Sequence, residues 1–287
     1  MPRLAYVNGR YLPHADARVH VEDRGYQLAD GVYEVVAIID GRFADLDGHM
    51  VRLARSLGEL AIEPPMPRRA LELVIRELVR RNGVRDGLVY LQVTRGVASR
   101  DFKFPSPKVK PALVLTTRKV SRFATPEQLE HGVGVITIPD IRWLRRDIKS
   151  VGLLAQALGK QKAVEAGCYE AWMVDADGLV TEGCSSNAWI VTTNGMLVTR
   201  QPDHMILNGI TRLSLLRLAG ELGIAAEIRP FSVAEALAAR EAFVSSALTF
   251  ALPVTRIDGQ VVGDGQPGAL TARLRAAYFA AVAGGAP

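Results

Sequence analysis

The stretch VYEVVAIIDGRFADLDGHMVRLARSLGELA, residues 32–61, contains a change of hydrophobic period that indicates the class of fold. Val32 to Ile39 is rich in β-branched residues and ends at Asp40-Gly41, a pair that favours a tight hairpin turn. From Asp47 onward the apolar residues recur at helical spacing behind an aspartate N-cap. A hairpin followed by an amphipathic helix predicts mixed α/β structure.

The same mixture continues on both sides of this stretch. Asn8-Gly9 predicts another hairpin near the N-terminus, and a helix is expected from Pro67 to Asn82-Gly83. A charged segment without strand alternation, which includes Pro126, separates this part from later strands and a helix predicted near residues 151–166. We therefore expect an α/β (α+β) protein with a small N-terminal domain (1–120), a linker (121–130) and a larger C-terminal domain (131–287).

Composition limits the classes of protein that the chain can belong to. The 287 residues are 48% hydrophobic, which is enough for one large core or two modest ones. Only two cysteines occur and no segment is apolar enough to span a bilayer, so we expect a soluble, cytoplasmic protein with no membrane partner. The net charge of +5 raises the alternative of nucleic-acid binding, but aromatic residues are only 6% and the arginines are dispersed.

One lysine stands out among the residues that can carry chemistry. The chain has seven lysines, and six lie in charged or loop contexts, whereas Lys149 precedes an apolar run. Apolar surroundings favour a neutral amine, which condensation with an aldehyde requires. The alternative is a surface ion pair between Lys149 and Asp147. Metal catalysis is not expected, because the five histidines lie outside metal-ligand spacing.

Two further features extend this interpretation. Glu182 ends an apolar strand, where a carboxylate needs a facing cation, either an arginine or the protonated ring nitrogen of pyridoxal phosphate. The loop Leu207 to Arg212 turns into an apolar helix, so the amides of Ile210 and Thr211 are placed to bind an anion. Arg52 can supply a charged fork to the same phosphate. A lysine, a glutamate and a phosphate site together point to pyridoxal phosphate.

Four strings give the chain a specific resemblance. DGVYEV (residues 30–35), RWLRRDIKS (142–150), TEGCSSN (181–187) and MILNGITR (205–212) occur in order along the chain. With them the chain resembles the class IV (fold type IV) aminotransferases, which use pyridoxal phosphate, and it is most similar to the bacterial D-amino acid aminotransferases. The resemblance implies a C-terminal domain built as a pseudo-barrel.

The resemblance also implies roles for individual residues. Lys149 matches the lysine that forms the internal aldimine and moves the proton, and Glu182 matches the partner of the pyridinium nitrogen. The phosphate site corresponds to Arg52, Ile210 and Thr211. Further cofactor contacts correspond to Leu207, Ser185, Ser246 and Ala247, where Ala247 replaces a threonine common in the family and Ser246 is expected to compensate.

Substrate recognition is implied in the same way. Tyr33 and Arg100 match a tyrosine and an arginine that bind the substrate carboxylate in the D-amino acid enzymes, the arginine coming from a loop of the other subunit of a homodimer. Phe102 stands where the family has a histidine. Because an arginine alone can still bind a carboxylate through two hydrogen bonds, this change puts substrate range in question.

The expected reaction is transamination between a D-amino acid, such as D-alanine or D-glutamate, and a 2-oxo acid, such as 2-oxoglutarate or pyruvate. The nearest alternative is an (R)-selective amine transaminase, which needs no carboxylate site and is favoured by Phe102. Branched-chain amino acid aminotransferase, of the same fold, is a more distant alternative.

Overall fold

The computed structural model describes residues 3–121 and 123–284 and divides the chain into two compact units. Unit 1 contains residues 3–121 together with residues 148–152, and unit 2 contains residues 123–147 and 153–284. Each unit builds a sheet of its own, so the predicted mixed α/β class is confirmed. Among the helices of the described residues, none has the length and apolarity that crossing a membrane requires.

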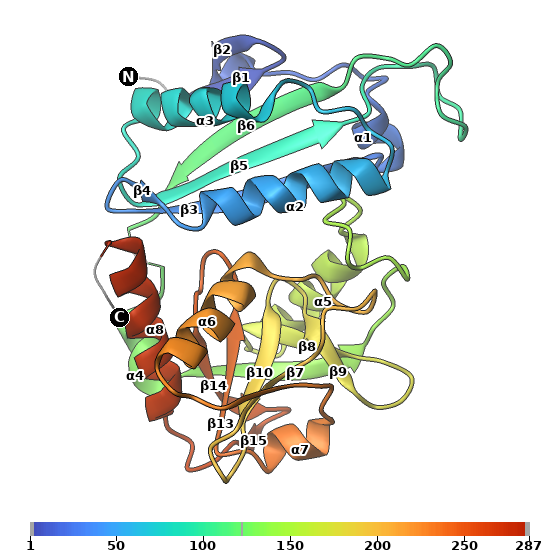
Figure 1. Ribbon diagram of the computed structural model, residues 1–287. Helices are drawn as coiled ribbons and strands as arrows, with labels where there is room; N and C mark the ends of the chain where they lie inside the picture. The colour runs from blue at the N-terminus through green and yellow to red at the C-terminus, as the bar shows by residue number, and fades with distance from the viewer. Residues whose placement is uncertain (1–2, 122, 285–287) are drawn as a thin grey trace. The chain divides into compact units, whose positions relative to one another are not determined.

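Unit 1 is a six-stranded antiparallel sheet with the order β2-β1-β6-β5-β3-β4. Helices α2 and α3 lie on one face of this sheet (Figure 1) and bury an apolar core against it. The elements of unit 1 are β1 (Leu4–Val7), β2 (Arg10–Pro13), a 3₁₀ turn (His14–Asp16), α1 (Arg24–Leu28), β3 (Gly31–Ile39), β4 (Arg42–Phe43), α2 (Leu46–Glu59), α3 (Arg68–Asn82), β5 (Gly87–Thr94) and β6 (Ala112–Lys119).

The predicted turns of unit 1 are confirmed. Asn8 and Gly9 both have positive φ angles, 46° and 100°, as a two-residue turn between β1 and β2 requires. Helix α3 ends at Asn82, and Gly83 follows in the left-handed conformation with a φ angle of 56°. Local sequence therefore determines where these elements stop.

A short segment from later in the chain completes the edge of this sheet. The amide of Tyr33 in β3 donates to the carbonyl of Lys149, and the amide of Val151 donates to the carbonyl of Gly31, both at 3.0 Å. The predicted start of the next helix, near residue 151, is wrong: α5 begins at Leu154. The backbone before it is hydrogen-bonded to β3 and cannot also enter a helix.

Unit 2 is built on a nine-stranded mixed sheet with the order β12-β11-β10-β13-β14-β7-β8-β9, and β15 pairs with β14. The pairs β14-β7, β7-β8 and β11-β12 are parallel. Strand β9, at one end of the order, also contacts β10, so the sheet curls on itself as the predicted pseudo-barrel does. Its elements are α4 (Pro126–His131), β7 (Val133–Pro139), α5 (Leu154–Glu165), β8 (Glu170–Val174), β9 (Val180–Gly183), β10 (Asn187–Val191), β11 (Leu197–Thr199), α6 (Ile210–Glu221), β12 (Ala226–Ile228), α7 (Val233–Leu237), β13 (Glu241–Ser245), β14 (Leu252–Ile257), β15 (Gln260–Val261) and α8 (Ala269–Val282).

The segment predicted as a linker contains a short helix. Helix α4 begins after Thr125, whose side chain accepts a hydrogen bond from the amide of Gln128, while the Gln128 side chain accepts one from the amide of Thr125. This reciprocal capping stabilises a short helix of six residues, and proline suits the first position of a helix, where Pro126 lies. The proline that was interpreted as a sign of irregular structure therefore starts a helix.

Candidate active site

Lys149 is positioned by strand pairing within unit 1. Its carbonyl accepts the hydrogen bond from Tyr33, and the neighbouring Ser150 forms a bridge with Val32. The half-buried side chain extends over Tyr33, with Nζ 4.2 Å from the centre of the aromatic ring. Asp147 belongs to unit 2 and pairs there with Arg145 and His204. The amine of Lys149 thus lies against an aromatic ring of its own unit.

A buried ion cluster lies on the strand that carries Tyr33. Glu34, fully buried, binds Arg52 through two hydrogen bonds of 2.7 Å and His49 Nδ1 through another of 2.7 Å. Burial alone would raise the pKa of Glu34, but Arg52 and His49 together lower it to about 2. Burial lowers the pKa of His49, and the nearby charge of Lys149 adds a smaller lowering. Arg52, expected to bind phosphate, is thus oriented by Glu34.

Sequence reasoning missed Glu34 and His49, although a signal was present. Side chains alternate along a strand, so Glu34 shares a face of β3 with Val32, Val36 and Ile38, all three of them buried. A carboxylate on an apolar strand face requires a cation nearby. Glu182 was selected as a carboxylate on an apolar strand, and the same criterion applies to Glu34.

The cluster makes a prediction about stability. Replacing Glu34 by glutamine leaves the buried Arg52 without its carboxylate, so we expect the free energy of unfolding at pH 7 to fall by about 3 kcal/mol or more. The matched control is Glu77→Gln, because Glu77 pairs with Arg80 and Arg81 at the surface, where solvent screens the ion pairs and the loss should be much smaller. Denaturant unfolding of the three proteins measures both differences.

The pH dependence of this effect has a definite sign. The pKa of Glu34 is lowered from its ordinary value of 4.5 to about 2 in the folded state. Such a carboxyl stabilises the fold fully above pH 4.5, and the contribution is lost as the pH falls toward 2. The difference between wild type and the Glu34→Gln variant should therefore shrink between pH 4.5 and pH 2. A difference that stays constant over this range would contradict the ion cluster.

Tyr33 also has an aromatic neighbour, Tyr90, which sequence reasoning missed as well. The two ring centres are 5.6 Å apart, and the hydroxyl of Tyr90 donates to Oε1 of Gln92 at 2.6 Å. Gln92 lies opposite Tyr33 in the register between β3 and β5. Burial raises the pKa of Tyr90 to about 12, so its hydroxyl remains protonated near neutral pH. Tyr90 therefore limits the positions that the Tyr33 ring can take.

Arg100 and Phe102 lie in the long connection between β5 and β6, which projects from unit 1 (Figure 1). Phe102 is 83% exposed, and the guanidinium of Arg100 lies 5.7 Å from the centre of its ring. Arg95, earlier in the same connection, is buried instead and binds Asp30 through two hydrogen bonds. Of the two arginines in this connection, Arg100 is the one presented at the surface.

In unit 2, Glu182 is the centre of a buried polar network. Its carboxylate accepts hydrogen bonds from Arg142, from Asn187 Nδ2 at 3.0 Å and from the amide of Leu207 at 3.1 Å. Arg142 also binds Asp140, at 2.7 Å. Burial raises the pKa of Glu182, while Arg142 and the Leu207 amide oppose this by stabilising the carboxylate. The structural ion pair that remained an alternative for Glu182 is therefore present.

Ser185 is held by a different carboxylate. Its hydroxyl donates to Oε2 of the fully buried Glu170 at 2.7 Å, and the hydroxyl of Ser186 donates to the same oxygen at 3.1 Å. Lys160 Nζ lies 3.7 Å from the other oxygen of Glu170. Glu170, which the sequence did not single out, therefore shapes the loop that follows Glu182.

The loop that is predicted to bind phosphate leads into α6, which begins at Ile210. Gly209 is the N-cap residue and has no side chain to accept from the first amides, which include those of Ile210 and Thr211. A Cβ at Gly209 would collide with Oδ1 of Asn187. Asn187 also donates to the carbonyl of Leu207 at 2.9 Å. Asn187 thus fixes the loop that presents these amides, and free amides at a helix start suit an anion.

Ser246 and Ala247 lie in a turn after β13. The hydroxyls of Ser246 and Thr249 lie 2.9 Å apart, and Oγ of Ser246 accepts from the amide of Thr249 at 3.3 Å. The same turn therefore carries a threonine hydroxyl two residues after Ala247, in contact with Ser246. Sequence reasoning considered Ser246 and missed Thr249.

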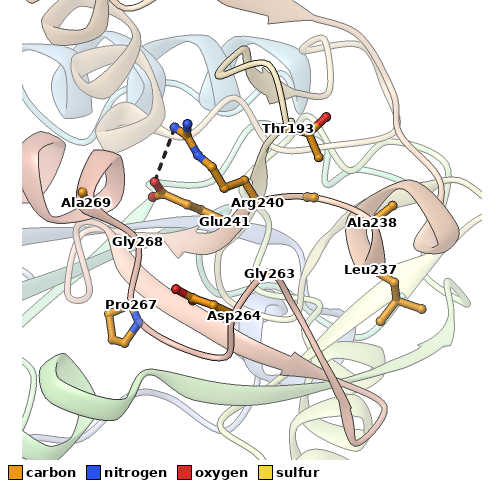
Figure 2. Close-up of a pocket in the computed structure, with 11 residues that line it drawn as sticks. Thr193, Leu237, Ala238, Arg240, Glu241, Gly263, Asp264, Pro267, Gly268 and Ala269 are labelled. Atoms are coloured by element: carbon orange, nitrogen blue, oxygen red, sulfur yellow. Dashed lines mark ion pairs between the residues drawn. The ribbon is translucent and has the colours of Figure 1, made fainter.

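A surface pocket of about 810 Å³ also lies in unit 2 (Figure 2), and none of the predicted site residues lines it. Arg240 and Glu241 in its wall are paired at 3.7 Å. The Glu241 carboxylate accepts from the amides of Leu270 and Thr271 at the start of α8. Arg240 and Glu241 are thus paired with each other, and we do not assign this pocket to the site.

Considered separately, the two units present complementary chemistry. Unit 1 offers an amine over an aromatic ring, and unit 2 offers a buried carboxylate and a helix start suited to an anion. This donor set fits an aldehyde, a ring nitrogen and a phosphate, the three polar parts of pyridoxal phosphate.

Comparison with known proteins identifies the family. The family described as amino-transferase class IV matches residues 31–257. D-alanine aminotransferase of Bacillus licheniformis is 42% identical over 94% of both chains, and that of Staphylococcus epidermidis is 38% identical over 95% of both. The structure of the T.th. branched-chain amino acid aminotransferase with pyridoxamine 5'-phosphate aligns with a TM-score of 0.92 at 27% identity, covering 100% of this chain and 96% of that one.

The chain belongs to the class IV aminotransferases. Enzymes of this class are pyridoxal phosphate enzymes with the fold type IV architecture. The resemblance inferred from the four strings is thereby confirmed.

Proposed function

We propose that this protein transfers the amino group of D-amino acids, such as D-alanine and D-glutamate, to 2-oxo acids, such as 2-oxoglutarate and pyruvate, with pyridoxal phosphate as its cofactor. The observation that carries the proposal is the placement of the Lys149 amine, held by β3 and covered by the ring of Tyr33. The choice of D-amino acids is supported by the D-alanine aminotransferases that share 42% and 38% of their residues with this chain.

Each residue has a defined part in this proposal. The bound cofactor supplies an aldehyde that takes up the amino group and a ring that withdraws electrons. Lys149 holds the cofactor through its amine and moves a proton to and from the substrate Cα. Glu182 keeps the ring nitrogen protonated, and the Leu207 side chain packs on the ring near Ser185. The amides of Ile210 and Thr211, with Arg52 and the turn of Ser246 and Ala247, bind the phosphate.

We further propose a cytoplasmic homodimer in which Arg100 and Phe102 serve the substrate site of the partner. The exposure of both residues on the β5–β6 connection supports this arrangement. The two cysteines, Cys168 and Cys184, are free, as a reducing compartment favours. Tyr33 and Arg100 then provide the carboxylate contacts, while Phe102 provides an apolar surface in place of an imidazole.

The substrate proposal is tested by single-turnover mixing of the cofactor-loaded protein with D-alanine, L-leucine and (R)-1-phenylethylamine. We expect D-alanine to convert the cofactor fastest. Arg100→Ala should weaken D-alanine binding by about ten- to a hundredfold, because a charge-assisted contact to the carboxylate is lost, and should leave the amine unaffected.

The other outcomes distinguish the alternatives. Faster conversion by the amine, with no effect of Arg100→Ala on either substrate, would assign the protein to the (R)-selective amine transaminases, which Phe102 favours. Faster conversion by L-leucine would assign it to the branched-chain enzymes. Lys108→Ala serves as the control for the loop, because Lys108 pairs with Glu63 at the surface.

A further inference from the structure

Arg212 is a buried cation in the first turn of α6, beside the proposed phosphate site. The residue is 1% exposed. One terminal nitrogen of its guanidinium donates to the carbonyl of Arg200 at 2.7 Å, and the other donates to Oδ1 of Asn208 at 3.3 Å. The guanidinium carbon lies 5.9 Å from the centre of the Trp189 ring. All of these contacts are to neutral groups.

The charge of Arg212 lacks a direct counterion. In the described part of the chain no carboxylate lies within ion-pair distance of it, and its Nε has no hydrogen-bond partner. Burial lowers the pKa of Arg212 to about 10, although the charge of Glu182 opposes this. A buried cation without a counterion is costly, and the cost falls if an anion binds nearby.

The surrounding network has the same imbalance. The network contains four buried arginine side chains and three carboxylates, so one positive charge remains within the network. The arginines are Arg142, Arg146, Arg200 and Arg212, and the carboxylates are Asp140, Asp175 and Glu182. Arg142 contacts two of the carboxylates and Arg200 contacts Asp175. The residue left without a carboxylate contact is Arg212.

The position of Arg212 links this charge to the start of α6. A Cβ built at Gly209 would lie 3.3 Å from Cβ of Arg212, so the base of the arginine side chain packs next to the N-cap residue. Its hydrogen bond to Asn208 restrains the residue before the N-cap. The charge therefore adds to the positive potential of the helix start, and the hydrogen bonds hold the loop that presents its amides.

We propose that Arg212 is a positioning residue for the phosphate group of the cofactor, acting through the first turn of α6 and supplying the positive charge that the phosphate neutralises. This inference rests on the proposed function, because it assumes that pyridoxal phosphate binds at this helix start. It adds a selective effect: Arg212 strengthens binding of a phosphorylated cofactor and leaves binding of the same ring without phosphate unchanged.

The test compares the affinity of the apoprotein for pyridoxal phosphate and for pyridoxal, measured by absorbance titration. Arg212→Gln keeps a donor for the Arg200 carbonyl and removes the charge. We expect it to weaken pyridoxal phosphate binding by about tenfold or more and to change pyridoxal binding by less than about twofold. Arg212→Lys, which keeps the charge, should bind pyridoxal phosphate within about threefold of wild type.

The control is Arg229→Gln, because Arg229 is a partly exposed arginine that pairs with Glu227 and Glu235. It should leave both affinities unchanged. Equal losses of both ligands in Arg212→Gln, or no loss of either, would overturn the inference. If Arg212→Gln does not fold, Arg212→Lys decides: wild-type binding of pyridoxal phosphate supports the inference, and a loss shared by both ligands overturns it. A wild-type protein that binds neither ligand refutes the proposed function itself.

Discussion

Replacing Lys149 by alanine should remove the visible absorbance of the cofactor-loaded protein and slow the half-reaction with D-alanine by at least about a thousandfold. The proposal gives Lys149 two tasks, covalent attachment of the cofactor and proton transfer at the substrate Cα, and general acid-base catalysis alone contributes about a hundred- to ten-thousandfold. Absorbance spectra and single-turnover mixing measure the two tasks separately.

Lys162→Ala is the matched control for this experiment. Lys162 lies on the exposed face of α5, so its loss should leave both the colour and the half-reaction unchanged. A Lys149→Ala protein that keeps the wild-type rate would refute the assignment of Lys149. A colourless wild-type protein that cannot be reconstituted with pyridoxal phosphate would refute the cofactor proposal as a whole.

Replacing Glu182 by glutamine should leave the cofactor attached but slow the half-reaction by about a hundred- to a thousandfold. Glutamine has nearly the same volume and can still accept from Asn187 and Leu207, but it carries no charge to keep the ring nitrogen protonated. The loss should therefore appear in the rate of conversion and in the shape of the absorption spectrum, with attachment of the cofactor retained.

Asp140→Asn separates this effect from disturbance of the ion network. In both variants Arg142 loses one of its two carboxylates, but in Asp140→Asn the carboxylate of Glu182 is kept. We expect a much smaller loss of rate in Asp140→Asn. Equal losses in the two variants would indicate that the position of Arg142, and not the charge of Glu182, controls the rate.

Local features of the structure were predictable because they depend on residues close together in sequence. The turn at Asn8 and Gly9 and the end of α3 at Gly83 follow from backbone conformations that these residues favour. The start of α6 at Ile210 was predicted from the same kind of signal. Of the features that were missed, the helix α4 could have been found, because its capping box lies within four residues of sequence.

Long-range pairings were not predictable from hydrophobic period. The ion pair between Arg142 and Glu182 joins residues forty positions apart, and that between Glu34 and Arg52 joins a strand to a helix. The pairing of β3 with the backbone of Lys149 is more distant still. A hydrophobic pattern indicates which face of an element is buried, but not which other element it meets.

The chain has 35 basic residues, of which only seven are lysines, and the structure gives one reason for the excess of arginine. Many arginines are buried beside specific partners: Arg24 and Arg95 bind Asp30, and Arg52 binds Glu34. A guanidinium suits such sites because it forms two parallel hydrogen bonds with a carboxylate. Part of the positive charge that raised the alternative of a nucleic-acid partner therefore lies in the interior of the protein.

The pairing of residues 149–151 with β3 has a consequence for the order in which the protein forms. The ribosome completes β1 to β6 by residue 119, yet the N-terminal half of β3 gains its last hydrogen bonds only when residues 149–151 emerge. Until then unit 1 has an unpaired strand edge next to Tyr33, a type of edge that can associate with other chains. A fragment ending at residue 121 should therefore self-associate, and translation past Lys149 is what closes this edge.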